Sequence, residues 1–211
     1  MSADPPLAPE ALEGLLAVSR ETISRLKTYA DLLALWQRAV NLVAPSTLPE
    51  LWRRHVLDSG QLFRHLPRQP CRLADLGSGA GFPGLVLAIM GAGEVHLVES
   101  DARKCAFLRE ASRKTGAAVV IHESRIEGLP DGGFEVVTAR ALAPLETLLG
   151  HAARLLAPGG SALFLKGRRA DEELTAAGKA WKMRLERFPS LSDPGGCILR
   201  IDEIAHAHHN R

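Results

Sequence analysis

The chain has 211 residues, 46% of them hydrophobic, which is typical of one globular domain with a small appendage. Lysine and arginine number 26 against 24 acidic residues, so the net charge of +2 does not by itself indicate a nucleic-acid-binding protein. No run of 18 apolar residues is present, and the first residues lack the features of a signal peptide, so we expect a cytoplasmic protein without membrane contact. Cys71, Cys105 and Cys197 are widely spaced, which indicates buried thiols rather than a disulfide framework or a metal site.

Any contact with RNA must therefore depend on local clusters of basic residues. The sequence has four of them: Arg53-Arg54, Arg103-Lys104, Arg113-Lys114 and Lys166-Gly167-Arg168-Arg169. Each cluster is open to two interpretations, a contact with phosphate or an ordinary solvated surface, because long cationic side chains often cover protein surfaces. Only the last cluster lies where a parallel sheet is expected to have its active edge.

Residues 1–66 are predicted to form an N-terminal helical appendage. Apolar residues recur at helical spacing in two stretches, one over residues 23–40 and one over residues 48–66, with Pro45 and Pro49 between them. In the second stretch His55 and Ser59 interrupt the apolar face, and Asp58 lies one turn from His55. Polar groups on a docking face need partners. They either tie this helix to the remainder of the protein or shape its functional site.

The next segment, residues 75–84, reads Asp-Leu-Gly-Ser-Gly-Ala-Gly-Phe-Pro-Gly and follows an apolar strand-like run. Glycines at a strand-to-helix turn allow positive φ and let a ligand lie against bare backbone. Pro83 is well placed in the first turn of the helix that follows. The segment therefore predicts a turn that holds an adenosine-type cofactor.

Two cofactors fit such a turn. Gly79, Gly81 and Gly84 match the dinucleotide fingerprint, with Glu99 twenty residues beyond Gly79 as the acid that binds ribose. Asp75 favours the other cofactor, because an ionised acid beside a helix N-terminus would repel a pyrophosphate. S-adenosylmethionine has no phosphate and carries two cationic groups, so the charge pattern favours a methyltransferase over a nicotinamide-dependent enzyme.

Beyond residue 70, strand-like and helical patterns alternate. Strands are predicted at residues 71–76, 94–99, 117–122, 134–139 and 161–166, with helices near 83–90, 101–115 and 144–156. A polar helix at 170–180 and two strands at 184–188 and 197–204 follow, and the last two strands are joined by a Pro/Gly-rich loop that makes them antiparallel. This predicts an α/β, Rossmann-like, doubly wound sheet with a C-terminal antiparallel hairpin, the class I methyltransferase architecture, over residues 67–205, followed by a frayed tail at 206–211.

Several polar side chains are expected at the carboxyl edge of this sheet, where open α/β sheets bind their ligands. Glu99 ends the second strand, where it can accept both ribose hydroxyls. Ser124-Arg125-Ile126-Glu127 follows the third strand, where it either wraps the adenine or forms an ordinary surface turn. Arg140 and Lys166 end the fourth and fifth strands. These two cations are the first candidates for the chemistry.

Together these motifs resemble one family, the bacterial RNA methyltransferase called RsmG or GidB. The resemblance spans roughly residues 36–204 and is carried by Asn41-Leu42, the Arg54-His55-Val56-Leu57-Asp58-Ser59 helix, residues 75–84, residues 124–127, Arg140-Ala141 and Leu165-Lys166-Gly167. It implies methyl transfer from S-adenosylmethionine to N7 of a guanine in small-subunit (16S) ribosomal RNA, with S-adenosylhomocysteine as product. A monomer that acts on a small-subunit particle or its precursor is expected. Glu99 departs from the Asp common in the family, and the chain lacks an extended basic tail.

Guanine N7 carries an exposed lone pair, so methyl transfer needs alignment of N7 with the methyl group more than it needs a general base. We therefore assign Arg140 and Lys166 to phosphate, guanine O6 or the cofactor carboxylate. The candidate catalytic residues are Arg140, Lys166, His55 and Asp58. The candidate cofactor-binding residues are Asp75, Gly77, Ser78, Gly79, Gly81, Phe82, Glu99, Arg125, Ile126, Glu127 and Arg140. A methyltransferase for another RNA or a small molecule, a non-catalytic RNA-binding module and a nicotinamide-dependent oxidoreductase remain the alternatives.

Overall fold

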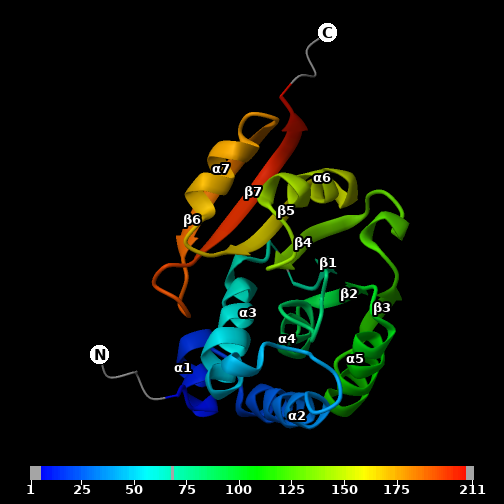
Figure 1. The fold of residues 1–211 in the computed structure, drawn as a ribbon, viewed down its shortest axis with the longest axis vertical. Helices are drawn as coiled ribbons and strands as arrows, with labels where there is room; N and C mark the ends of the chain where they lie inside the picture. Colours follow the sequence, from blue (N-terminus) through cyan, green and yellow to red (C-terminus); the bar gives the residue numbers. More distant parts are fainter. Residues whose placement is uncertain (1–5, 68, 208–211) are drawn as a thin grey trace.

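A computed structural model of the protein describes residues 6–67 and 69–207. Within these residues the strands form one sheet in the order β3-β2-β1-β4-β5-β7-β6. Strands β1 to β5 are parallel, whereas β7 is antiparallel to both β5 and β6 (Figure 1). The strands are β1 Cys71–Leu76, β2 Gly93–Glu99, β3 Val119–Glu123, β4 Phe134–Arg140, β5 Leu156–Lys166, β6 Trp181–Pro189 and β7 Cys197–His206. The predicted parallel sheet with an antiparallel C-terminal hairpin is confirmed.

The strand ends differ from the prediction by a few residues. Strand β5 begins at Leu156, because this residue still pairs with Phe134 before the register shifts. The hairpin is longer at its open end, where Trp181 pairs with His206 and the two rings stack with centroids 4.0 Å apart. His206, the first residue of the predicted tail, therefore belongs to β7, and residues 208–211 of that tail lie outside the described residues.

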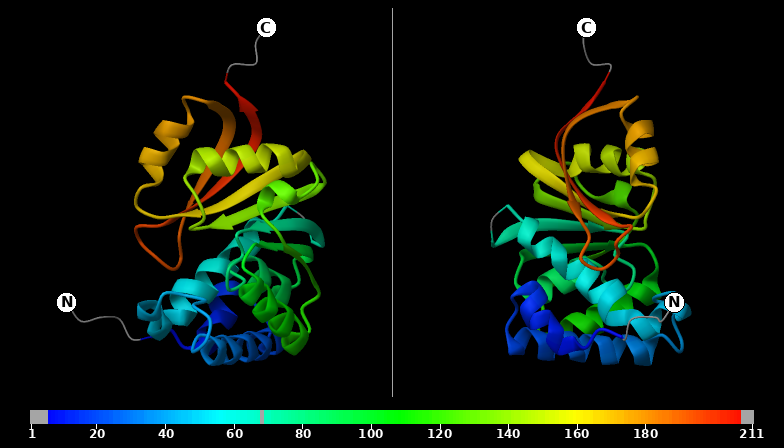
Figure 2. Two further views of the ribbon diagram at one scale, coloured as in Figure 1. Left: turned by 45° about the vertical axis from the view of Figure 1, so that its right-hand side comes forward. Right: turned by 90° about the vertical axis from the view of Figure 1, so that its left-hand side faces the viewer.

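The helices lie on both faces of the sheet. One face carries α4 Gly84–Met90 and α5 Ala102–Thr115, and the other carries α6 Leu145–Leu155 and α7 Ala170–Ala177 (Figures 1 and 2). Each face of the sheet has its own hydrophobic core. Because successive strand residues point to opposite faces, Leu73 lies in the core on the side of α4 and α5, whereas Ala74 and Leu76 lie in the core on the side of α6. The three cysteines are buried and unpaired, as predicted.

The N-terminal segment is less regular than predicted. It contains α1 Leu12–Leu16, α2 Arg20–Trp36 and α3 Asp58–Gly60, together with short 3-10 turns at Pro9–Ala11, Pro45–Glu50 and Gln61–His65 and a π-helical turn at Trp52–Leu57. Helix α2 ends at Trp36 rather than at residue 40, because the Gln37 side chain accepts hydrogen bonds from the amides of Leu42 and Val43 and so holds a turn. The predicted second helix is a succession of helical turns, and Pro49, which has no amide hydrogen, lies in its first part.

These N-terminal helices pack against the layer formed by α4 and α5. The rings of Trp36 and Phe107 contact edge to face with centroids 5.7 Å apart, and Tyr29 lies between Phe107 and Phe82. Buried residues of the N-terminal segment and of the sheet belong to one continuous core. The segment thus forms an outer layer of the fold, and its description as a separate appendage stays a prediction.

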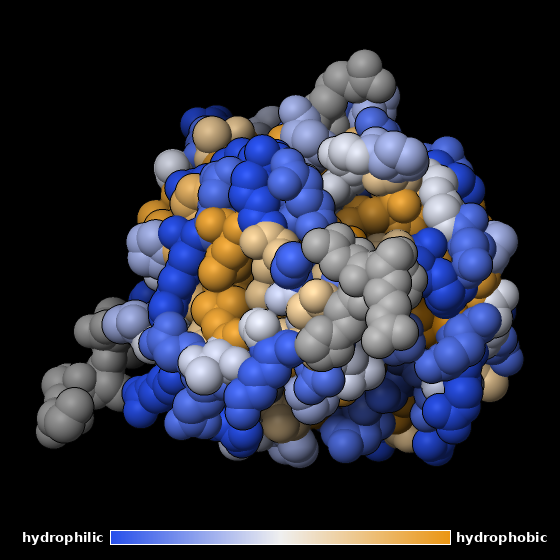
Figure 3. All heavy atoms as spheres, turned by 90° about the horizontal axis from the view of Figure 1, so that it is seen from above, coloured by the Kyte–Doolittle hydropathy of each residue, from blue (hydrophilic) through white to orange (hydrophobic). Residues whose placement is uncertain are grey.

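Strand β6 is one edge of the sheet. Its exposed positions carry mainly charged side chains, which discourage pairing with another sheet. Figure 3 views this end of the molecule from above and shows hydrophilic residues around smaller apolar areas. None of the helices in the described residues is long and apolar enough to cross a membrane.

Candidate active site

The glycine turn leaves a stretch of bare backbone beside Glu99. Gly79 has a φ of 57° and a Cβ atom placed there would meet only the Gly77 carbonyl oxygen, at 3.8 Å. The Gly79 amide donates a hydrogen bond of 2.9 Å to Glu99 Oε2. Gly77, with a φ of 64°, is packed differently, because a Cβ atom there would lie 2.5 Å from Leu142. Only glycine fits both positions, and the space over Gly79 is open to a ligand.

Asp75 lies beneath this turn rather than beside the open space. Its carboxylate is fully buried. It accepts one hydrogen bond from the Gly84 amide at 3.1 Å and a second from the Thr138 hydroxyl at 2.8 Å. Burial raises the pKa of Asp75 to about 6, partly offset by the hydrogen bonds from Thr138 and Gly84. Ser78 is also buried, and its hydroxyl donates to the Asp75 carbonyl and accepts from the Val98 amide. Both residues hold the shape of the turn from inside.

Glu99 connects the glycine turn to the segment after β3. Its Oε1 accepts from the Asp101 amide at 2.8 Å, while its own carbonyl accepts from the Ser124 amide at 3.1 Å. Each carboxylate oxygen can accept a further hydrogen bond, as the predicted ribose contact requires. Ile126 is partly buried against the core, whereas Arg125 and Glu127 are exposed. The predicted adenine segment therefore adjoins the predicted ribose acid.

Arg140, at the end of β4, is the centre of a second cluster. Its guanidinium donates to the Arg54 carbonyl at 3.0 Å and to His55 Nδ1 at 2.8 Å, and it lies 3.5 Å from Asp58 Oδ2. The same guanidinium lies 5.0 Å from the centroid of the Phe82 ring. Two of the predicted catalytic residues, His55 and Asp58, thus contact the third, Arg140, and do so from the N-terminal segment.

The hydrogen bonds assign the protonation state of His55. The Thr47 hydroxyl donates to the Ala44 carbonyl, so it accepts from His55 Nε2, and Nδ1 accepts from Arg140. Burial, reinforced by the charges of Arg140 and Arg54, lowers the pKa of His55 to about 3. His55 is therefore neutral with both ring nitrogens engaged. It positions Arg140 and has no nitrogen free to act as a general base.

Asp58 joins the N-terminal segment to the loop between β6 and β7. Its Oδ1 accepts from the Ser192 hydroxyl at 2.5 Å and from the Gln61 side-chain amide at 3.0 Å. Burial raises the pKa of Asp58, and the hydrogen bond from Ser192 and the charge of Arg140 oppose that shift. The Asp58 carboxylate thus contacts both Arg140 and the loop between β6 and β7.

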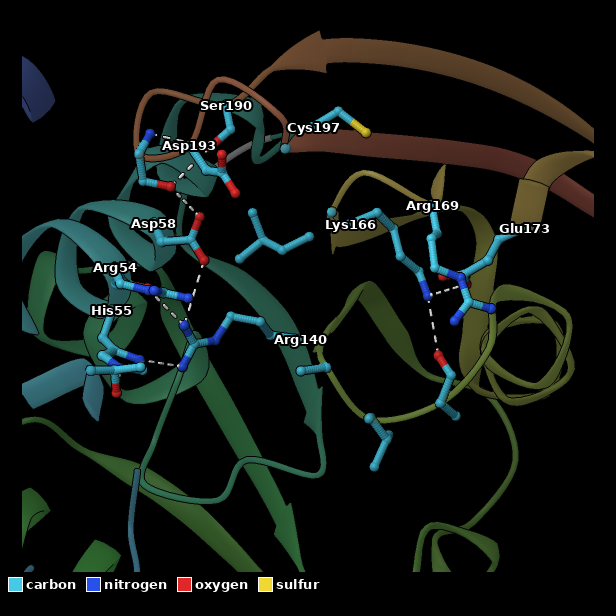
Figure 4. A pocket seen from close by; sticks show the side chains of 18 of the residues that line it. Arg54, His55, Asp58, Arg140, Lys166, Arg169, Glu173, Ser190, Asp193 and Cys197 are labelled. Carbon is cyan, nitrogen blue, oxygen red and sulfur yellow. Dashed lines mark hydrogen bonds and ion pairs between the residues drawn. The ribbon is translucent and has the colours of Figure 1, made fainter. Parts of the chain in front are cut away.

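Lys166, at the end of β5, lies across a pocket from Arg140 (Figure 4). Its ammonium donates to Glu173 at 2.7 Å and to the Ala143 carbonyl at 3.1 Å. Burial tends to raise the pKa of Glu173, but the hydrogen bonds from Lys166 and the Leu145 amide hold it below its usual value. The two edge cations do not contact each other; they border a pocket of about 690 Å³.

Helix α2 reaches the glycine turn through Tyr29. The hydroxyl of this fully buried residue donates a hydrogen bond of 2.5 Å to the Ala80 carbonyl. The ring of Phe82 packs between Tyr29 and His55, with centroid distances of 5.4 and 5.0 Å. The turn predicted to hold the cofactor and the cluster around Arg140 are therefore parts of one packed unit.

Known proteins show the family to which the chain belongs. The model of the family described as rRNA small subunit methyltransferase G, or GidB, matches residues 22–194. The chain belongs to this family. The matched stretch includes the glycine turn, the Arg140 cluster and Lys166, so the predicted family resemblance is confirmed.

Several proteins named ribosomal RNA small subunit methyltransferase G are similar over most of their length. The protein from Paramagnetospirillum magneticum is 58% identical over 199 residues, which cover 94% of this chain and 97% of that protein. The protein from Rhodospirillum rubrum is 55% identical over 201 residues, covering 95% of this chain and all of the relative. The chain thus matches these relatives over nearly its full length.

Solved structures with little sequence identity show the same fold. A methyltransferase from Aquifex aeolicus that depends on S-adenosylmethionine superimposes with a TM-score of 0.56 at 16% identity, covering 76% of this chain and 94% of that one. The ribosomal protein L11 methylase from Lactobacillus delbrueckii gives a TM-score of 0.55, also at 16% identity, over 68% and 75% of the two chains. The predicted class I methyltransferase fold of this GidB family member is confirmed.

Sequence reasoning missed several residues of the site. Tyr29 had a signal, because it is the only tyrosine of the chain and lies on the apolar face of a helix, where its hydroxyl needs a partner. Thr47 and Gln61 carried no such signal in the sequence, because their hydrogen bonds to His55 and Ser190 depend on how the chain folds. Glu173 is one of three consecutive acidic residues at the start of α7, and nothing in the sequence separates it from Asp171 and Glu172.

Proposed function

We propose that this chain transfers a methyl group from S-adenosylmethionine to N7 of a guanine in 16S ribosomal RNA. Membership of the rRNA small subunit methyltransferase G family supports the reaction and the class of substrate. One structural observation carries the proposal. The open turn at Gly79 and the pocket between Arg140 and Lys166 lie on the same carboxyl edge of the sheet, and Leu142 contacts the turn while lining the pocket.

The residues at the turn fit S-adenosylmethionine. Gly79 leaves room for a ligand on bare backbone, and Glu99 has acceptor capacity for ribose hydroxyls. Ile126 offers an apolar surface next to the base position that we propose. When bound, the cofactor supplies an electrophilic methyl group on a sulfonium. Gly77 and Gly81 shape the same turn, and Asp75 and Ser78 support it from below.

The side chains around the pocket are suited to positioning rather than to proton transfer. Guanine N7 carries a free lone pair, so no proton has to be removed before it attacks. His55 is neutral and engaged at both nitrogens, which is consistent with a reaction that needs no histidine base. Arg140 is held by three partners from the N-terminal segment and therefore presents its guanidinium in a fixed orientation.

Charge decides what the two edge cations would contact. The purine gains positive charge when N7 is methylated, so a cation directly at N7 would oppose the reaction. Arg140 and Lys166 are better suited to guanine O6, an RNA phosphate or the cofactor carboxylate, all of which accept hydrogen bonds from cations. We further propose that the protein is a cytoplasmic monomer that acts on a small-subunit particle or its precursor.

The proposal is tested by methyl transfer in vitro. Small ribosomal subunits from a bacterial strain that lacks this enzyme are incubated with the protein and radiolabelled S-adenosylmethionine, and the modified nucleotide is mapped by N7-specific cleavage. We expect one labelled guanine in 16S RNA. Gly79→Leu is the control, since its side chain would enter the open space and abolish cofactor binding measured by calorimetry. Label on another atom, or on free guanosine as readily as on the particle, contradicts the proposal.

A further inference from the structure

The structure divides the basic residues of the chain into paired and unpaired ones. Arg113 on α5 forms an ion pair with Glu110 at 2.7 Å, and Arg103 lies 3.7 Å from Asp101. In the two clusters near the pocket, one arginine of each is paired in the same way: Arg53 lies 3.8 Å from Glu50, and Arg169 lies 3.4 Å from Glu172. These partners reduce the charge that is free to attract an RNA phosphate.

Arg54 and Arg168 differ from these neighbours. Both are exposed, and neither side chain has an acidic partner among residues 6–67 and 69–207. Arg54 lines the pocket, next to His55, and its carbonyl accepts the hydrogen bond from Arg140. Arg168 lies against the loop between β6 and β7, because a Cβ atom on Gly195 would be 2.8 Å from Arg168 Cγ. Arg54 therefore lines the pocket, and Arg168 lies just outside it, between the lining residues Gly167 and Arg169.

The segment that carries Arg54 and the loop beside Arg168 are connected by hydrogen bonds. The Gln61 side chain donates to the Ser190 hydroxyl at 3.1 Å and accepts from the Leu191 amide at 2.7 Å. The Ser192 hydroxyl donates to Asp58, one turn beyond Arg54. These bonds join the helical segment that carries Arg54 to the loop on which Arg168 rests. Figure 4 shows this loop, with Ser190 and Asp193, beside Asp58. The segment that carries Arg54 is thus bonded to the loop that the Arg168 side chain contacts.

We propose that Arg54 and Arg168 form a phosphate clamp that holds the RNA strand on both sides of the base in the pocket. This inference rests on the proposed function and specifies how the RNA is held. Specific RNA recognition commonly uses a base splayed out of a single strand, which leaves the flanking phosphates at the pocket rim. Arginine suits this position, because its planar guanidinium binds phosphate oxygens in pairs.

Local charge makes phosphate the fitting ligand. Arg140 and Lys166 have acidic partners inside the pocket, so the unpaired positive charge lies at its rim. Asp193 is the acid in this wall without a basic partner among the described residues, and its Oδ1 accepts from the Gly195 amide of its own loop. With a net charge of only +2, the protein has little general attraction for RNA, so a local clamp has to supply it.

The clamp is tested by the salt dependence of binding. Arg54→Ala and Arg168→Ala are titrated, at several KCl concentrations, with unmethylated small ribosomal subunits in the presence of S-adenosylhomocysteine. Each variant should bind roughly fivefold more weakly at about 0.1 M salt, and the slope of log affinity against log salt should decrease by about 0.7 for each phosphate that the protein no longer binds. The double variant should show the sum of the two decreases. Arg113→Ala is the matched control, because Arg113 is paired with Glu110 and lies outside the pocket.

The possible outcomes separate this inference from the proposed function. Affinity for S-adenosylhomocysteine, measured by calorimetry without RNA, should be unchanged in both variants, which excludes a damaged fold. If wild-type protein methylates the particle and both variants retain its salt slope, the clamp is wrong while the proposed function stands. If wild-type protein neither binds nor methylates the particle, the proposed function and the clamp both fail. A loss of slope in Arg113→Ala as large as in Arg54→Ala also contradicts the clamp.

Discussion

At the scale of single residues, burial decides how the titratable groups of the site behave. His55 and Asp75 are both nearly or fully inaccessible, and burial moves their pKa values in opposite directions, to about 3 and about 6. In each case the neutral form is favoured, because a charged group loses its hydration on burial. Hydrogen bonds then assign each residue a fixed role, His55 to Arg140 and Asp75 to the glycine turn.

The raised pKa of Asp75 predicts a pH dependence of stability. A carboxyl group whose folded-state pKa lies above its unfolded value of 3.8 stabilises the fold fully below that value and loses this contribution as the pH rises through about 6. Relative to Asp75→Asn, the wild-type free energy of unfolding should therefore fall by roughly 2 kcal/mol between about pH 4 and about pH 7. Urea unfolding of both proteins at several pH values measures this difference. A constant difference across that range would contradict the prediction.

Arg140→Ala should lose methyl transfer to the particle while the protein stays folded. The change removes a fixed cation from the pocket and leaves Asp58 and His55 without one partner, so we expect at least about a hundredfold loss of rate. Arg184→Ala is the matched control, because it removes an ion pair with Asp202 on the hairpin, away from the pocket. Single-turnover rates and thermal unfolding of both variants separate a loss of catalysis from a loss of stability. Normal turnover by Arg140→Ala would show that its guanidinium is only structural.

At the scale of elements, the N-terminal helices take part in shaping the site. Helix α2 contacts the glycine turn through Tyr29, and the helical turns around His55 hold the cation at the end of β4. The hairpin loop lines the pocket with Ser190, Ser192 and Asp193, and it is bonded to Asp58 and Gln61 of the N-terminal segment. The N-terminal segment and the hairpin loop thus complete the pocket at the end of β4 and β5.

Tyr29→Phe should weaken cofactor binding. The variant removes the hydrogen bond to the Ala80 carbonyl and keeps the ring between Phe82 and Phe107, so the turn loses an anchor without a cavity being created. We expect the KM for S-adenosylmethionine to rise about fivefold to tenfold, consistent with roughly 1 kcal/mol for one hydrogen bond. Arg25→Gln is the control, because Arg25 ties α2 to the end of α5 at Thr115 and not to the turn. An equal rise in KM in both variants would indicate general loosening of α2.

At the scale of the whole molecule, the low net charge and the neutral state of His55 predict how the enzyme responds to substrate and pH. The nucleophile needs no deprotonation, and His55 stays neutral far above its pKa of about 3. With saturating particle, the single-turnover rate should therefore vary less than about twofold from about pH 7 to about pH 8.5. A rate that climbs tenfold per pH unit would indicate a titrating base and a different acceptor atom. Short oligonucleotides should be poor substrates, because the protein depends on RNA shape and on a local clamp to place the base.

The class of fold and the position of the glycine turn could both be predicted from the sequence. Both follow from local signals, since strand periodicity, glycine spacing and the Pro/Gly-rich loop of the hairpin each act over a few neighbouring residues. The sequence also placed Arg140 and Lys166 at the carboxyl edge, because every parallel strand ends there. Family motifs such as residues 54–59 could be recognised in the same way, without knowledge of their contacts.

The contacts that those residues make are visible only in the folded chain. Asp75 was predicted to face the cofactor, yet its oxygens are directed to Gly84 and Thr138, the second of which lies 63 residues away. His55 meets Arg140 across 85 residues, and Asp58 meets Ser192 across 134. Hydrogen bonds between such distant segments form only after the cores on both faces of the sheet have packed. No local pattern encodes these bonds, so the partners of these side chains could not be predicted from the sequence.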